Sequence, residues 1–248
     1  MRAYLGDPQF RKDFLAEIRM HQHADVRHDG FGETGMDGKC RRCSVGCTIH
    51  TLNRLKGTDY STTWHEVYEI ELGIPMALAY MEDCIFHGIP LGTARNWTYH
   101  FSSAIAAGAD LSLVVPKFMV WLMKDMERYA KEGDARLIRQ VGSLYGRVAR
   151  GEGVSKDEWA EPATGRAGFA AAEAARAALA VEGNFMGYAA DALTDAAYAA
   201  DHAARAALGA DVSPSDAFEA ADDAREESFT RMSRRLIRIL RSTGPEWD

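Results

Sequence analysis

Apolar residues recur every three or four positions along most of the chain, which is the spacing of one face of an α-helix. The pattern begins at Phe10, after Asp7 as an N-cap residue and Pro8 at the first helical position. We expect this first helix to end at about Asp25 or His28. The glycine-rich stretch DGFGETGMDGK follows, and its composition predicts no regular structure.

Turn residues divide the rest of the chain into further helices. Gly73 is a typical helix stop, Pro75 opens the next helix, and Gly88 and Pro90 close it. Ser213 is the N-cap of the last helix. The expected helices lie between the cysteine run and residue 55, at about 61–73, 75–86, 94–107, 111–129 and 135–148, within 167–210, and from 213 onward. The predicted fold class is therefore all-α.

The composition of the chain changes beyond residue 150. We expect a helical region with a Cys/His site over residues 1–150, and a linker rich in Gly, Glu and Lys over residues 151–166. Residues 167–248 are predicted to form an alanine-rich helical region that ends in an amphipathic helix. Because alanine has a small side chain and the highest helix propensity, these helices are expected to pack closely.

The net charge excludes some classes of protein. The chain has 29 Lys and Arg against 36 Asp and Glu, which gives a formal net charge of −7. General nucleic-acid binders and membrane-surface binders carry a basic field instead, so the charge argues against both. The N-terminus has charges where a signal peptide needs an apolar stretch, and no apolar run is long enough to span a membrane. These features predict a cytoplasmic protein.

The last predicted helix has acidic residues in its first half and arginines in its second half, an order that complements the helix dipole. Its arginines are Arg231, Arg234, Arg235, Arg238 and Arg241. We interpret them as a solvated face, with a local contact to phosphate or to an acidic partner as the alternative. The apolar residues from Phe229 recur at spacings of 3, 4 and 3, as in a coiled-coil seam, so this helix could also support a homo-oligomer.

Four candidate metal ligands lie in the run CRRCSVGCTIH, namely Cys40, Cys43, Cys47 and His50. Thiolates and imidazoles are ligands that zinc selects, and four of them would suffice for a closed tetrahedral site. The sequence therefore predicts a zinc site here. Two alternatives stay open: the thiols pack in the core, or they carry redox or nucleophilic chemistry, which requires exposure and a depressed pKa.

The segment from Arg42 to His50, followed by EIELGIP at Glu69 to Pro75, resembles a group of bacterial and bacteriophage proteins with a GC-x-VGC segment and then an E-x-ELGIP segment. The group has no known activity, so the resemblance implies none. The shared pattern matches Cys43, Cys47 and His50 but not Cys40. This favours a motif of three residues over a closed site of four.

A second candidate site is on the first helix. His21, Asp25 and His28 continue the apolar face of that helix at positions i, i+4 and i+7. Helices present imidazole and carboxylate groups at such spacings to divalent metals or as general acid and base. The alternative is a helix end with solvated histidines.

A third candidate set is divided between two helices. His65 with Glu69, and Asp83 with His87, are each spaced i, i+4. If the two helices pack across the turn between Gly73 and Pro75, these groups would face each other. A metal-dependent hydrolase needs such convergence of His and carboxylate ligands. Solvated helix charges are the simpler explanation.

No known catalytic motif accompanies these sets, so whether the protein is an enzyme stays open. The preferred prediction is a helical, zinc-binding protein of phage or mobile-element origin that acts by binding an unknown protein partner. The alternative is a metal-dependent hydrolase that uses the His and carboxylate residues above.

Overall fold

The structure is a computed structural model, and it describes residues 2–24, 33–34, 40–41, 43–130, 132–163, 169–179, 185–208 and 213–244. The fold is all-α, as predicted. One two-residue antiparallel ladder is the exception among these residues: Glu33 of β1 pairs with Arg41 of β2, and Thr34 with Cys40. No helix in the described part of the chain is long and apolar enough to cross a membrane.

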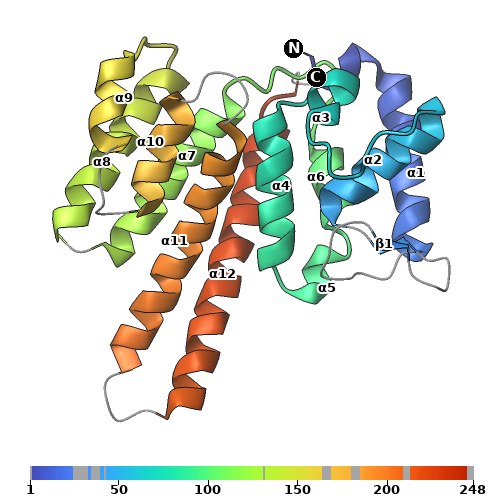
Figure 1. The fold of residues 1–248 in the computed structure, drawn as a ribbon. Helices are drawn as coiled ribbons and strands as arrows, with labels where there is room; N and C mark the ends of the chain where they lie inside the picture. Colours follow the sequence, from blue (N-terminus) through green and yellow to red (C-terminus); the bar gives the residue numbers. More distant parts are fainter. Residues whose placement is uncertain are drawn as a thin grey trace. The chain divides into compact units, whose positions relative to one another are not determined.

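The chain divides into two compact units, and Figure 1 shows their helices. Unit 1 comprises Met1–Val114 and Leu236–Asp248, and unit 2 comprises Val115–Arg235. The division by contacts therefore falls at other places than residues 151–166, where composition had suggested a linker. Part of that stretch, Lys156–Ala163, is a helix that packs against its neighbours inside unit 2.

Unit 1 consists of a short 3-10 turn, the two-residue ladder and a set of α-helices. Their bounds are η1 Ala3–Gly6, α1 Pro8–Ala24, β1 Glu33–Thr34, β2 Cys40–Arg41, α2 Ser44–Lys56, α3 Val67–Leu72, α4 Met76–Gly88, α5 Leu91–Ala94 and α6 Trp97–Ala104. The last residues of α12 also belong to this unit.

The first helix begins as its sequence predicts. The carboxylate of Asp7 accepts hydrogen bonds from the backbone N–H groups of Gln9 (2.8 Å) and Phe10 (3.0 Å), so Asp7 is the N-cap of α1. Phe14 and Ile18 are fully buried, which confirms the predicted apolar face. The preceding turn η1 was not predicted, and the ladder lies partly in the stretch for which no regular structure was expected.

Two helix boundaries differ from the expectation. The helix expected at about 61–73 begins only at Val67, as α3, because turns occupy the chain up to Glu66. The helix expected at 94–107 is two helices, α5 and α6, which are separated by a turn. The predicted stop at Gly73 is confirmed, since this glycine has a φ of 61° in the left-handed region.

The core of unit 1 is built from large side chains. Helix α2 contacts α1, α4 and α6, and these helices enclose aromatic and branched aliphatic residues. Fully buried members include Phe14, Ile49, Leu78, Trp97 and Phe101. Each such side chain contributes about 1.5–3 kcal/mol through removal of its surface from water.

Unit 2 is a series of helices in chain order. Their bounds are α7 Val114–Met126, whose first residue is counted in unit 1, η2 Glu127–Tyr129, α8 Glu132–Ala149, α9 Lys156–Ala163, α10 Phe169–Leu179, α11 Phe185–Leu208 and α12 Pro214–Arg241 up to Arg235. The hydroxyl of Ser213 accepts a hydrogen bond from Asp216 N (3.2 Å), which confirms the predicted cap of α12.

Alanines form much of the buried surface between α10 and α11. Ala171, Ala174, Ala175, Ala192 and Ala197 are fully buried, and the two helices lie side by side (Figure 1). Small side chains of this kind permit a close approach of two helix backbones. The hydroxyl of Tyr145 on α8 donates to the carbonyl of Ala174 (2.7 Å).

Candidate functional site

Helix α4 carries two neighbouring acidic residues with different surroundings. Glu82 is fully buried and lies at the centre of a hydrogen-bond network. Tyr68 Oη donates to Glu82 Oε2 (2.7 Å), and Ser44 Oγ is hydrogen-bonded to Glu82 Oε1. Ser44 Oγ also lies 2.8 Å from Thr98 Oγ1. The network therefore connects α4 to α2, α3 and α6.

The carboxyl group of Glu82 resists ionisation. Burial raises its pKa to about 8, against the hydrogen bonds from Ser44 and Tyr68 that lower it, and the neighbouring Asp83 raises it further. At neutral pH the group is therefore mostly protonated, and it can donate as well as accept a hydrogen bond. The backbone carbonyl of the same residue accepts from Trp97 Nε1 (3.0 Å).

Asp83 lies closer to the surface and faces two imidazole rings. His65 Nε2 is 4.0 Å from Asp83 Oδ2, and His87 Nε2 is 3.9 Å from Asp83 Oδ1. The His65 side chain is 10% exposed and that of His87 is 40% exposed. We call His65, Asp83, His87 and the nearby Cys43 the Asp83 cluster. The structure thus brings together three residues of the third predicted set.

The ring of His65 is held in one orientation. Its Nδ1 lies 3.0 Å from the carbonyl of Thr63, which can only accept, so Nδ1 carries the hydrogen. The ring also stacks on Tyr80, with centroids 4.0 Å apart. In the neutral ring Nε2 is then an acceptor that faces a carboxylate oxygen. His65 Nε2 and Asp83 Oδ1 are both buried without a hydrogen-bond partner in the described structure.

Cys43 is a buried thiol with suppressed reactivity. It is the N-cap of α2, and its Sγ accepts from the N–H of Gly46 (3.4 Å). Burial and then the Asp83 carboxylate, to which the thiol donates a hydrogen bond, raise the pKa of Cys43 to about 12. A nucleophilic or redox-active thiol needs the opposite shift, so Cys43 does not fit that alternative.

The described residues do not fit the predicted zinc site. Within the part of the chain that the structure describes, no group of three or more His, Cys, Asp and Glu side chains could hold a metal ion. Cys47 and His50 are half-buried on α2, while the side chain of Cys40 lies outside the described part. In the Asp83 cluster the nitrogen-to-oxygen separations of about 4 Å exceed those between two ligands of one tetrahedral zinc. Zinc binding therefore stays a prediction.

Glu69, the fourth residue of the third predicted set, has another role. Glu69 Oε1 accepts from the backbone N–H of Met76 (3.0 Å), so this carboxylate satisfies the N-terminus of α4. His21 is in α1, but its side chain lies outside the described part of the chain, as do Asp25 and His28 entirely. Sequence reasoning gave Glu82 no role of its own. Its signal was a pair of acids, Glu82 and Asp83, inside an otherwise apolar helical run.

Unit 2 presents a different kind of surface on the hairpin of α11 and the α12 residues up to Arg235, called the α11–α12 hairpin here (Figure 1). Two aromatic rings are exposed on it, Tyr198 at 45% and Phe218 at 61%. The guanidinium of Arg225 lies over the Tyr198 ring at 5.9 Å, and that of Arg205 lies over the Phe218 ring at 5.8 Å.

The two stacked pairs follow from one spacing. Tyr198 and Arg205 are seven residues apart on α11, and Phe218 and Arg225 are seven apart on α12. Seven residues are close to two helical turns, so each pair lies on one face of its helix. Antiparallel packing then places each ring opposite the arginine of the other helix. Sequence reasoning missed this surface, although the repeated spacing was its signal.

The arginines of α12 do not all form a solvated face. Arg231 donates to Asp125 Oδ2 (3.1 Å) and to Tyr129 Oη (2.8 Å), both within unit 2, and pairs with Glu227 (3.3 Å). The prediction was wrong for Arg231, because this guanidinium is half-buried in an internal ion pair. It holds for Arg234, Arg238 and Arg241, which are exposed.

Comparison with protein-family models, with curated proteins and with solved structures gave no match. The resemblance to a bacterial and bacteriophage group therefore stays a prediction, as do the phage origin, the cytoplasmic location and the homo-oligomer.

Proposed function

We propose that this protein acts by binding another protein, and that the α11–α12 hairpin is its binding surface. The observation that carries the proposal is the pair of exposed rings, Tyr198 and Phe218, each with an arginine from the opposite helix against it. Aromatic and arginine side chains are enriched at the centres of protein interfaces, where a few of them supply most of the binding energy.

The surface is prepared for binding because its side chains are already held. Arg205 Nε donates to the buried carboxylate of Asp201 (2.6 Å), one turn earlier on the same helix. Arg225 is paired in the same way with Asp222. Each arginine in turn restricts the ring that it covers. Less side-chain entropy is lost when such a surface binds than when exposed side chains must first be ordered.

The charge around the rings indicates the chemistry of the partner. Both arginines of the surface are compensated by their own aspartates. Asp216, Glu219 and Asp223 are exposed on α12 beside them, so the hairpin carries a negative field. The complementary partner is a protein surface with lysine and arginine residues around an apolar recess that accepts Phe218.

The other predicted functions are not part of this proposal. Among the described residues no group of three or more His, Cys, Asp and Glu side chains could hold a metal ion, so the zinc site and the metal-dependent hydrolase have no support there. In the Asp83 cluster, burial raises the pKa of the Cys43 thiol, so this thiol is not an activated nucleophile.

The proposal is tested by crosslinking from the hairpin in the cells that produce the protein. A photoreactive benzoylphenylalanine replaces Phe218 in one variant and Leu91, an exposed residue of unit 1, in the control. We expect a crosslink to a second protein from position 218 only, at a segment of that protein rich in Lys and Arg. Affinity of the two purified proteins is then measured by calorimetry.

We expect Phe218→Ala to weaken binding about thirtyfold, as for an interface hot spot, and Leu91→Ala to leave it unchanged. Glu219→Lys with Asp223→Lys should weaken binding and reduce its dependence on salt. Equal crosslinking from both positions would overturn the proposal. A crosslink to another copy of this chain would show that the hairpin forms a homo-oligomer and does not bind a basic partner, and would also contradict the proposal.

A further inference from the structure

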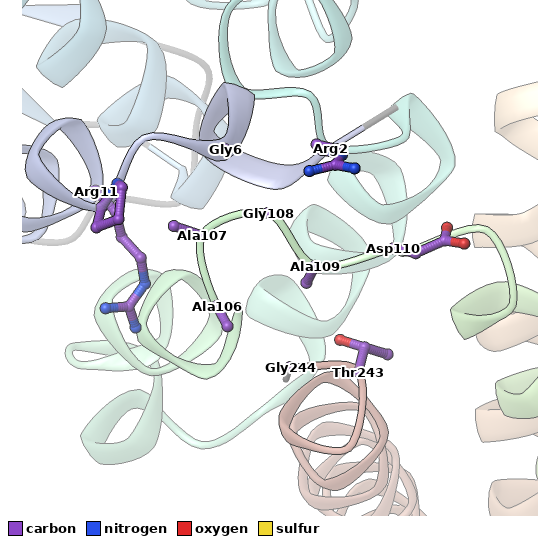
Figure 2. Close-up of a pocket in the computed structure, with 11 residues that line it drawn as sticks. Arg2, Gly6, Arg11, Ala106, Ala107, Gly108, Ala109, Asp110, Thr243 and Gly244 are labelled. Atoms are coloured by element: carbon purple, nitrogen blue, oxygen red, sulfur yellow. The ribbon is translucent and has the colours of Figure 1, made fainter. Parts of the chain in front are cut away.

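Unit 1 contains a pocket of about 680 Å³ that the proposed function does not use. Figure 2 shows it around the loop Ala106–Ala109, together with residues near the N-terminus, Asp110, and Thr243 and Gly244, which follow α12. Its volume is within the range of small-molecule sites in proteins. All of its lining residues belong to unit 1.

The walls of the pocket are mostly backbone. Gly6, Ala106, Ala107, Gly108, Ala109 and Gly244 line it. Because these residues have small side chains or none, a ligand can approach the peptide groups of the loop closely. Gly244 has no spare room, since a Cβ there would lie 3.1 Å from that of Ala106.

Two arginines supply positive charge to the pocket. Arg11 donates from Nε to the carbonyl of Ile105 (2.6 Å) and from Nη2 to that of Ser103 (2.7 Å), and its guanidinium lies 5.9 Å from the ring centroid of Tyr4. A guanidinium has five N–H groups, so Arg11 is fixed in place with three still to donate. Arg2 is an exposed side chain at the pocket.

The backbone beside the pocket is strained. Tyr4 and Leu5 have φ values of 52° and 55°, in the left-handed region that costs an L-residue about 1–2 kcal/mol. Hydrogen bonds hold this turn against the loop: Ala3 N donates to Ala109 O (3.1 Å) and Gly108 N to Ala3 O (2.7 Å). Strain of this kind concentrates at ligand sites, where the surrounding structure maintains it.

We propose that this pocket binds a small molecule through its carboxylate or phosphate groups, which Arg11 and Arg2 hold. Planar guanidinium groups recognise both kinds of oxyanion by paired, charge-assisted hydrogen bonds. Asp110, whose carboxylate accepts from Ser112 N (2.9 Å), keeps its negative charge because these contacts lower its pKa. It repels an anion from its own end of the pocket, where Figure 2 also shows Arg2, so Arg11 at the opposite end is the main anchor of an anionic group.

The experiment is calorimetric titration of the whole protein with pyrophosphate and, separately, with citrate, which distinguish phosphate from carboxylate recognition. We expect saturable binding of one probe at one site per chain. Arg11→Gln should weaken it by about tenfold or more, the usual effect of losing a charge-assisted hydrogen bond. Arg2→Gln should weaken it less.

Lys12→Gln is the matched control, because it removes the same charge from an exposed position on α1 that does not line the pocket. It should leave the affinity unchanged. Since Arg11 also holds two backbone carbonyls, folding of Arg11→Gln is checked by circular dichroism. If this variant does not fold, the affinity of Arg2→Gln tests the proposal instead. Absence of saturation with both probes, or an equal loss in Lys12→Gln, would overturn the proposal.

Discussion

Helix α4 of unit 1 and helix α10 of unit 2 bury their inner faces with different side chains. On α4, Leu78, Met81 and Ile85 are buried around the carboxyl group of Glu82, which needs hydrogen-bond partners from other helices. On α10, the buried side chains that the structure describes are all alanines, which require only a close neighbouring helix. The packing of α4 therefore depends on a few specific polar contacts, whereas the packing of α10 depends on the small size of its side chains.

The largest effect that follows from this difference is expected at Glu82. Glu82→Ala leaves the hydroxyl groups of Tyr68 and Ser44 without their buried partner and creates a cavity, which together cost about 3–5 kcal/mol. Glu82→Gln keeps an acceptor and a donor and should cost about 1 kcal/mol.

Hydrogen exchange followed by mass spectrometry measures the protection of backbone amides in each unit separately. We expect Glu82→Ala to lose protection in α2 and α4, while α10 and α11 keep theirs. The exposed Glu66→Ala is the control and should change neither unit. Equal stability of Glu82→Ala and wild type would show that the buried network contributes nothing to unit 1.

The second effect is a dependence on pH that is confined to unit 1. The pKa of Glu82 rises from 4.5 to about 8 on folding, so the native state binds the proton more tightly than the unfolded state. The stabilisation of the native state by the proton on Glu82 is fully present below pH 4.5 and is lost as the pH rises toward 8. The free energy of unfolding should fall by at most about 4 kcal/mol between pH 5 and pH 8.

Urea unfolding at a series of pH values measures the slope of the free energy of unfolding against pH. Hydrogen exchange in α4 then tests whether this slope arises in unit 1. Glu82→Gln has no proton to lose at that position and should remove this part of the slope. If the wild type and Glu82→Gln have parallel profiles, Glu82 is not the group that titrates.

The smallest of the three effects concerns the alanine core. Ala192→Leu adds three carbon atoms where α11 is fully buried, and overpacking of this kind costs about 1–3 kcal/mol. Ala206→Leu on the exposed face of the same helix should change the free energy of unfolding by less than about 0.5 kcal/mol. Urea unfolding of both variants makes the comparison, and a stable Ala192→Leu would mean that α10 and α11 have room between them.

The candidate sites were partly visible in the sequence. The i, i+4 spacing of Asp83 and His87 correctly suggested proximity, and the turn at Gly73 correctly suggested that His65 would join them. Glu69, however, caps α4 instead. No spacing rule indicates this, because the N–H that it satisfies belongs to the next helix.

The features that the sequence determined by itself are features of local structure. Helix periodicity, the caps at Asp7 and Ser213 and the stop at Gly73 all depend on residues within a few turns of one another. Short-range preferences of this kind are decided by backbone geometry and side-chain size, so they can be derived from the order of residues alone.

Only the tertiary structure decided which polar groups are buried and what they face. Glu82 and Asp83 are consecutive, yet one is fully buried and hydrogen-bonded while the other faces two imidazoles. The same holds for the rings and arginines of the α11–α12 hairpin. The physical reason is that desolvation and charge interactions act between helices that are distant in sequence, so the charge state of a residue is set by its neighbours in space.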